Sequence, residues 1–146
     1  MDSETVVRKF MDLSQEGKFD EASRYLDDSM LFIGATPEPV SKKDFVDLTK
    51  KLVNAMPDWR FNYRDLHTQG DRVSMTVQIT GTQSREIQPL MPGMPLIPVT
   101  GKHISLPNQT QYATVHNDKI TRLEVEDIPG GGLMGILQQL GIDLPR

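Results

Sequence analysis

The chain has 146 residues, enough for one domain with a single substantial core and too few for two comfortable ones. It carries 16 basic and 20 acidic residues, a net charge of -4, without any block of like charges, so the basic footprint of a nucleic-acid-binding protein is missing. Cysteine is absent, which excludes disulfides and thiolate chemistry, and no apolar run approaches the roughly 20 residues that span a bilayer. These features predict one domain over residues 1–146 that binds neither nucleic acid nor membranes.

The first third of the chain predicts helices. Apolar residues recur at helical spacing behind Ser3, the expected N-cap, and Gly17 closes this first helix. A short second helix follows from about residue 19, and the apolar run at 30–33 predicts a short strand. Ser41 and Asp44 fit a capping box for a third helix that Pro57 ends. We expect helices over about residues 3–56, and a cytoplasmic protein, because the acidic, amphipathic start is unlike a signal peptide.

From Trp59 onward the apolar period changes from about 3.6 to two, which is typical of strands. Residues 59–69 and 73–79 predict an antiparallel hairpin, and residues 101–116 and 119–128 predict another. Between them, residues 87–98 carry four prolines and predict an extended loop. The sheet then occupies about residues 58–128, and a terminal helix about 132–140. This order predicts an α+β fold with the helices on one face of a mostly antiparallel sheet.

Several short motifs, in this order, resemble the SnoaL-like polyketide cyclases and the ketosteroid isomerases of the nuclear-transport-factor-like superfamily. They include PDWRF at 57–61, GDRV at 70–73, TGT at 80–82, TGK at 100–102 and the tail at 132–141. The resemblance implies a cone-shaped, cystatin-like barrel of a curved sheet wrapped around the helices. It also implies an apolar pocket that is open at one end, a small flat apolar ligand, and a homodimer formed through the sheet.

The residues that transfer protons in these enzymes are missing at the matching positions. The resemblance places the isomerase tyrosine on Phe10, the isomerase base on or near Ile33, and the isomerase strand acid on or near Gln111. It places the cyclase aspartate on Val125 and the cyclase histidine on Gln111. The resemblance therefore favours a protein that binds an apolar metabolite. The alternative is an active cyclase- or isomerase-type enzyme with another general acid or base.

Asp127 is the candidate for that acid or base. Strand alternation places it on the same face as Leu123 and Val125, which would be the pocket face if these apolar residues point inward. A carboxylate beside an apolar pocket is costly to ionise, so its pKa would rise toward neutrality. A second interpretation is simpler: an aspartate at a strand end often caps the turn that follows, here Ile-Pro-Gly-Gly-Gly.

The remaining candidates are ligand-binding residues. If Val115 marks the inner face of its strand, Gln109 and Gln111 line the pocket, where they would bond a ligand carbonyl or hydroxyl, or pair with each other or with water. Trp59, Tyr63, Met75 and Leu123 would line the pocket or belong to the core. The three histidines show no metal-ligand spacing, and no glycine-rich loop cradles a phosphate, so we expect no metal and no cofactor.

Two apolar segments, residues 88–97 and 130–137, are rich in methionine, glycine and proline. A protein in water rarely leaves that much contiguous apolar surface exposed, so both segments are expected to cover something. The terminal helix could act as a lid over the pocket, hinged at the three glycines. Alternatively, both segments complete the core or a subunit interface.

Overall fold

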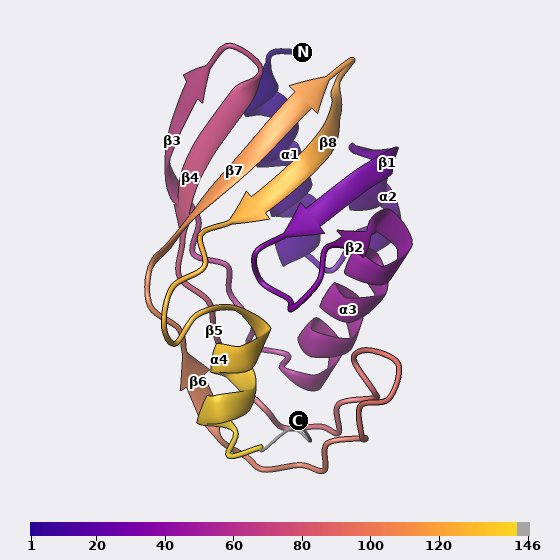
Figure 1. Ribbon diagram of the computed structural model, residues 1–146, viewed down its shortest axis with the longest axis vertical. Helices are drawn as coiled ribbons and strands as arrows, with labels where there is room; N and C mark the ends of the chain where they lie inside the picture. Colours follow the sequence, from indigo (N-terminus) through magenta and orange to yellow (C-terminus); the bar gives the residue numbers. More distant parts are fainter. Residues whose placement is uncertain (143–146) are drawn as a thin grey trace.

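A six-stranded sheet with helices packed on one face organises the chain (Figure 1). The computed structural model describes residues 1–142. The strands lie in the order β2-β1-β8-β7-β4-β3, and a separate two-stranded sheet pairs β5 with β6. The predicted α+β class, with a mostly antiparallel sheet, is confirmed. The sheet does not close into a barrel, because β2 and β3 remain as its two edges.

Four helices are present in the described residues. They are α1 (Ser3–Gln15), α2 (Phe19–Ser23), α3 (Lys42–Ala55) and α4 (Gly132–Gln139). The predicted cap of α3 is confirmed, since the Ser41 hydroxyl accepts a hydrogen bond from the Asp44 amide at 3.4 Å. The predicted cap of α1 is wrong by one residue: the Asp2 carboxylate accepts from the Thr5 amide at 2.8 Å, and Ser3 is already helical. Both residue types cap helices well, so sequence preference does not separate them.

The strands are β1 (Leu26–Ile33), β2 (Val40–Ser41), β3 (Arg64–Gln69), β4 (Arg72–Val77), β5 (Thr80–Thr82), β6 (His103–Ser105), β7 (Gln109–His116) and β8 (Lys119–Val125). The hairpins β3-β4 and β7-β8 are antiparallel, as predicted. β1 pairs in parallel with β8, so the sheet includes a strand from the helical first third of the chain. The sheet was expected to begin near residue 58, but β1 also belongs to it. The sequence does not reveal this, because the pairing joins segments that are far apart along the chain.

Two predicted strands have other boundaries. Residues 59–63 are not a regular strand: Arg60 makes an isolated bridge to Thr80, and β3 begins only at Arg64. Asn62 and Asp65 have φ angles of 49° and 58°, which interrupt the pleat of a strand. The segment predicted over 101–116 is divided, because β6 pairs with β5 and only β7 joins the large sheet. Alternating side chains reveal an extended backbone but not these interruptions.

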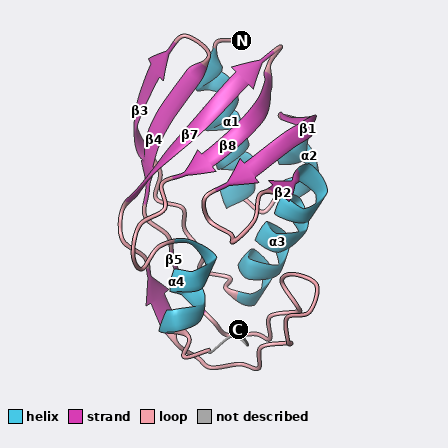
Figure 2. Ribbon diagram, in the orientation of Figure 1, coloured by secondary structure: helices cyan, strands magenta, loops and turns pink. Residues whose placement is uncertain are grey.

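The core consists of two buried clusters. The first lies between the large sheet and helices α1 and α3, and it includes Val6, Phe10 and Leu123. The second lies at the other end of the molecule, where α4 packs beside β6 (Figure 2). It buries four leucine or isoleucine side chains of the α4 segment, namely Leu133, Ile136, Leu137 and Leu140.

The proline-rich loop folds back on itself and contributes to this second cluster. Ile87 and Ile97 exchange two backbone hydrogen bonds of 2.9 Å, and both side chains are buried. The buried amide of Gln83 ties the loop ends together, because its Nε2 donates to the carbonyls of Arg85 and Pro98 at 3.1 and 3.0 Å. The expectation that this apolar loop covers something is confirmed: it covers the second cluster.

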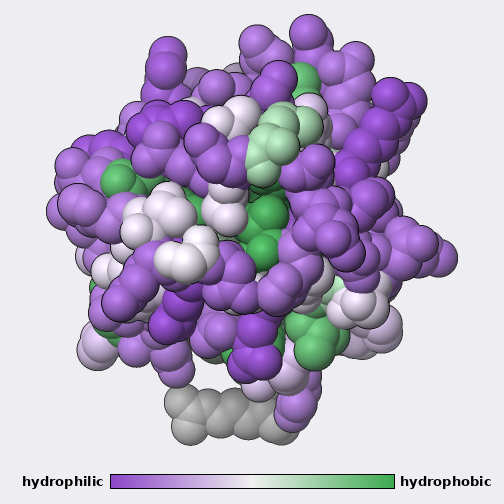
Figure 3. All heavy atoms as spheres, turned by 90° about the horizontal axis from the view of Figure 1, so that it is seen from above, coloured by the Kyte–Doolittle hydropathy of each residue, from purple (hydrophilic) through white to green (hydrophobic). Residues whose placement is uncertain are grey.

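The face seen from above carries mainly hydrophilic residues, and hydrophobic residues form only small separate areas on it (Figure 3). Within residues 1–142, no helix has both the length and the apolar character that crossing a membrane requires. A few large apolar side chains are exposed in the described residues, among them Leu31, Leu96 and Met134.

Candidate functional site

An apolar cavity lies where the two core clusters meet. Its volume is about 100 Å³. Phe10, Phe32 and Leu123 of the first cluster line it from one side, and Trp59 and Leu133 of the second line it from the other. Side chains of α1, α2, α3, β1, β4, β7, β8 and α4 all contribute to the wall. The cavity is therefore a product of the whole fold and not of one motif.

Aromatic rings form much of this wall. The rings of Phe32 and Phe45 lie 4.5 Å apart, and those of Phe10 and Phe45 lie 6.3 Å apart. Trp59 meets Phe61 edge to face at 5.7 Å. All five rings line the cavity. Such walls favour a flat apolar ligand through dispersion and ring-quadrupole contacts.

No titratable side chain lines the cavity in the part of the chain that the structure describes. The polar side chains in its wall are serine, threonine and glutamine, and most are bonded to the protein backbone. Ser14 donates to the Phe10 carbonyl at 2.8 Å, and Thr49 donates to the Phe45 carbonyl at 2.9 Å. These hydroxyls donate hydrogen bonds within their own helices, so they have little remaining capacity to bond a ligand.

Gln109 of β7 is buried and fully engaged with the protein. Its Nε2 donates to the Glu126 carbonyl at 3.0 Å, and its Oε1 accepts from the Gly132 amide at 3.4 Å. The N-cap residue of α4, Gly131, has no side chain to cap the helix. Gln109 supplies that missing acceptor from the sheet, which anchors α4 over the cavity.

Gln111, two residues further along β7, is in a different situation. Its side chain is also buried, with 8% exposed, and it lines the cavity. It has no side-chain hydrogen bond within residues 1–142, and its amide is not sealed off by neighbouring atoms. The amide therefore has free donor and acceptor capacity inside an apolar site.

The positions singled out by family resemblance converge on this cavity. Gln111 and Val125 lie directly opposite each other on β7 and β8, and Phe10 faces them from α1. Ile33 is not part of the wall, but its neighbour Phe32 is. The positions that the resemblance matches to acids and bases thus hold an amide, a valine and a phenyl ring, with the ring of Phe32 in place of Ile33 in the wall. None of these groups transfers a proton near neutral pH.

The geometric premise for Asp127 is wrong. β8 ends at Val125, so the alternation that would send Asp127 inward stops two residues earlier. The side chain is exposed and does not line the cavity. It also does not cap the following turn, since the Gly131 amide bonds the Ile128 carbonyl at 3.1 Å and, within residues 1–142, the Asp127 carboxylate accepts no hydrogen bond. A strand pattern in sequence does not show where a strand stops.

The other predicted ligand-binding residues divide into two groups. Trp59, Gln109, Gln111 and Leu123 line the cavity, whereas Tyr63 and Met75 do not. Tyr63 instead donates its hydroxyl to the Asp12 carboxylate, and burial together with this bond raises the pKa of the phenol to about 12. Met75 is only 1% exposed and belongs to the first core cluster. Within residues 1–142, no group of three or more potential ligands could hold a metal ion.

Sequence reasoning missed several wall residues. Ser14, Thr49 and Phe45 come from helices whose apolar stripes were interpreted as core alone. For α4 a signal was present: the apolar tail was expected to reach the pocket, and Gly132, Leu133 and Ile136 do line it.

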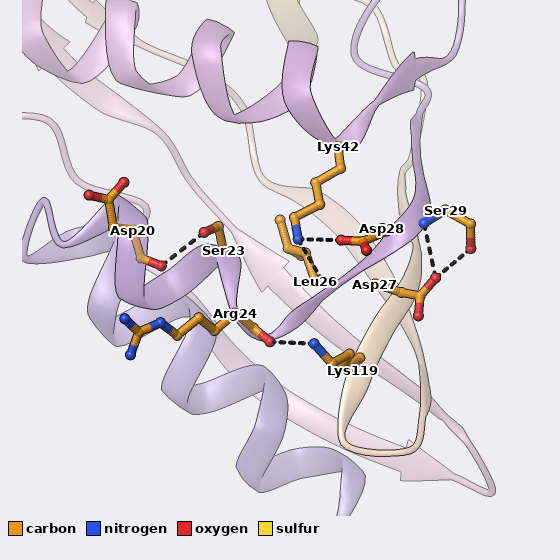
Figure 4. A network of polar contacts seen from close by, with 9 residues as sticks. All are labelled: Asp20, Ser23, Arg24, Leu26, Asp27, Asp28, Ser29, Lys42 and Lys119. Carbon is orange, nitrogen blue, oxygen red and sulfur yellow. Dashed lines mark hydrogen bonds and ion pairs between the residues drawn. The ribbon is translucent and has the colours of Figure 1, made fainter.

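Polar contacts fix the α2 side of the cavity, where α2, β1 and α3 meet (Figure 4). The Lys42 ammonium donates to the Leu26 carbonyl at 3.0 Å and to the Asp28 carboxylate at 3.2 Å. Lys119 of β8 donates to the Arg24 carbonyl at 3.3 Å. These bonds hold the start of β1 between α3 and β8, and so position Leu26 in the wall.

A sequence profile described as SnoaL-like polyketide cyclase matches residues 4–140 of the chain. The chain belongs to the SnoaL-like polyketide cyclase family. The resemblance seen in its motifs is thereby confirmed. A comparison with curated proteins gave no match.

Solved structures show the same fold at low sequence identity. A SnoaL-like polyketide cyclase from Agrobacterium tumefaciens str. C58 is 19% identical with a TM-score of 0.67, over 97% of this chain and 99% of that one. AclR from Streptomyces galilaeus, described as a candidate hydroxylase, is 17% identical with a TM-score of 0.72, over 98% and 97%. IdmH from Streptomyces antibioticus, described as a candidate polyketide cyclase, is 15% identical with a TM-score of 0.71, over 97% and 100%. These identities establish the fold, not the reaction.

Proposed function

We propose that this SnoaL-like protein binds a neutral, flat, apolar small molecule in its central cavity, without acid/base catalysis by the cavity wall. The observation that carries the proposal is the composition of that wall: apolar and aromatic side chains with no titratable group within residues 1–142. An ionised ligand would lose its hydration there without gaining a counter-charge, which is strongly unfavourable. A neutral ring system would gain apolar contact on all sides.

The alternative, a cyclase- or isomerase-type enzyme with Asp127 as general acid or base, has weaker support. A proton-transferring group must come within hydrogen-bonding reach of the atom it serves, directly or through one water. Asp127 is exposed beyond the end of β8 and outside the cavity wall. The position opposite Gln111 is occupied by Val125, which has no proton to transfer.

The binding proposal can be tested with N-phenyl-1-naphthylamine, a neutral apolar fluorophore. Trp59 is the single tryptophan of the chain and lines the cavity, so it reports on occupancy by transferring excitation energy to the probe. We expect saturable quenching of Trp59 emission together with a rise in probe emission. Val125→Phe should fill part of the cavity and weaken probe binding by roughly tenfold or more.

Leu96→Phe is the matched control, because Leu96 is an exposed loop residue outside the cavity wall. It adds the same ring and should leave probe affinity unchanged. If Val125→Phe binds the probe as well as the wild type, or if the two variants weaken binding equally, the cavity is not the binding site.

The homodimer implied by family resemblance is supported by the outer face of the sheet. Helices cover only the inner face, and the outward side chains of β7 include Thr110, Tyr112 and Thr114, which are half-buried. Arg72 stacks over the Tyr112 ring, with Cζ 4.0 Å from the ring centroid. A sheet face that no helix covers can pair with a second copy.

A further inference from the structure

One polar group in the cavity wall is left with open bonding capacity. The lining hydroxyls of Ser14, Ser23 and Thr49 donate to backbone carbonyls, and both ends of the Gln109 amide are bonded. The Trp59 Nε1 has no partner among the described residues, but neighbouring atoms seal it from the cavity. Among residues 1–142, no group bonds the Gln111 amide, and the amide is not sealed, although the residue is more than nine-tenths buried.

The placement of Gln111 makes this free amide a recognition element. It lies in the middle of β7, between Met75 on β4 and Val125 on β8. Both of these cross-strand neighbours are apolar, so neither can bond the amide. The amide opens into the cavity, so a ligand that bonds it is favoured over an apolar ligand that displaces water and leaves the amide unpaired. By contrast, the amide of Gln109, on the same face of the strand, is bonded by backbone groups of the protein and has a structural role.

We infer that Gln111 selects neutral apolar ligands that carry a hydrogen-bond acceptor and a donor on adjacent atoms, such as the carbonyl and N–H of a lactam. A glutamine amide presents one acceptor and one donor side by side, and it pairs in two-bond geometry with a group that presents the complementary pair. This inference rests on the proposed binding function and adds the chemical class of the ligand. Sites built around a buried polar group reject analogues that leave it unpaired.

The test uses two probes of equal size and shape. The lactam 2-quinolone and the hydrocarbon 2-methylnaphthalene have the same number of non-hydrogen atoms in the same flat bicyclic frame, and only 2-quinolone has the acceptor-donor pair. Their dissociation constants are measured by displacement of N-phenyl-1-naphthylamine from the wild type and from Gln111→Met. Gln138→Met is the matched control, because it makes the same substitution at an exposed position of α4 that is outside the cavity wall.

We expect Gln111→Met to weaken 2-quinolone binding by roughly tenfold. The affinity for 2-methylnaphthalene should stay the same or increase, and Gln138→Met should change neither constant. Equal effects of Gln111→Met on both probes, or none on 2-quinolone, would overturn the role of Gln111 while leaving the apolar binding function intact. If neither probe displaces the fluorophore from the wild type, the inference about Gln111 is wrong, whereas the proposed function is decided by fluorophore binding to the wild type and to Val125→Phe.

Discussion

Gln109 and Gln111 are the same residue type, two positions apart on β7, and both line the cavity, but the fold uses them differently. Gln109 bonds the Glu126 carbonyl and the Gly132 amide, which links the sheet to the start of α4. Gln111 has no such partner within residues 1–142. At the residue scale, an amide is structural or ligand-facing depending on whether backbone groups lie within hydrogen-bonding distance of it.

This difference predicts opposite effects of one substitution on stability. Gln109→Met leaves two backbone groups without their partner and should lower the free energy of unfolding by about 1–3 kcal/mol. Gln111→Met removes an unpaired amide and should be neutral or stabilising, within about 1 kcal/mol. Urea unfolding of both variants, followed through Trp59 emission, measures the two changes. A larger loss for Gln111→Met than for Gln109→Met would contradict this account of the two amides.

At the scale of elements, α4 is held as part of the core as well as of the cavity wall. Leu133, Ile136 and Leu137 are each less than 5% exposed. The Leu133 amide donates to the Ala35 carbonyl at 2.8 Å, so the helix start is also tied to the loop after β1. Of the two roles expected for the tail, this packing favours completion of the core over a freely moving lid.

Gly135 of α4 provides an element-scale prediction that opposes helix propensity. Glycine-to-alanine changes in a helix normally stabilise it by about 1 kcal/mol. Here a Cβ at position 135 would lie 2.1 Å from the Gly130 carbonyl oxygen, which belongs to the backbone and cannot move aside cheaply. We expect Gly135→Ala to lower the free energy of unfolding by about 1–3 kcal/mol, measured by urea unfolding.

Gln138→Ala is the control, since Gln138 is an exposed α4 residue and the change should stay within about 0.5 kcal/mol of zero. If urea unfolding shows that Gly135→Ala is at least as stable as the wild type, the close approach of α4 to Gly130 is refuted.

At the scale of the whole molecule, the cavity lies between two clusters that no single segment builds. The first cluster depends on the parallel pairing of β1 with β8, and the second on the proline-rich loop and α4. The outer face of the large sheet remains available for a second subunit. We therefore predict that the homodimer forms through this face.

Sedimentation equilibrium at micromolar concentration should give a mass of twice the 16.5 kDa of the chain. Tyr112→Lys would place a second positive charge beside Arg72 in the middle of the proposed interface, and we expect it to shift the equilibrium toward monomers. Gln138→Lys, which adds the same charge on α4, should remain dimeric. A wild-type protein that sediments as a clean monomer would rule out the dimer at that concentration.

The sequence by itself determined the features that depend on neighbours along the chain. Hydrophobic periodicity predicted the helices and both hairpins, the Ser41 cap followed from local hydrogen bonding, and ordered motifs predicted the SnoaL-like family. That Phe10, Gln111 and Val125 cannot transfer protons near neutral pH also follows from residue identity alone, whereas their match to the acids and bases of the family stays a prediction from resemblance.

Only the tertiary structure decided the features that depend on contacts between distant segments. The parallel β1-β8 pairing, the end of β8 before Asp127 and the hydrogen bond from Tyr63 to Asp12 have no local signature. The different hydrogen bonding of Gln109 and Gln111 also depends on a contact between distant segments. Both have the same side chain on the same strand face, and their difference arises because the start of α4, more than twenty residues later in the chain, reaches one amide and not the other.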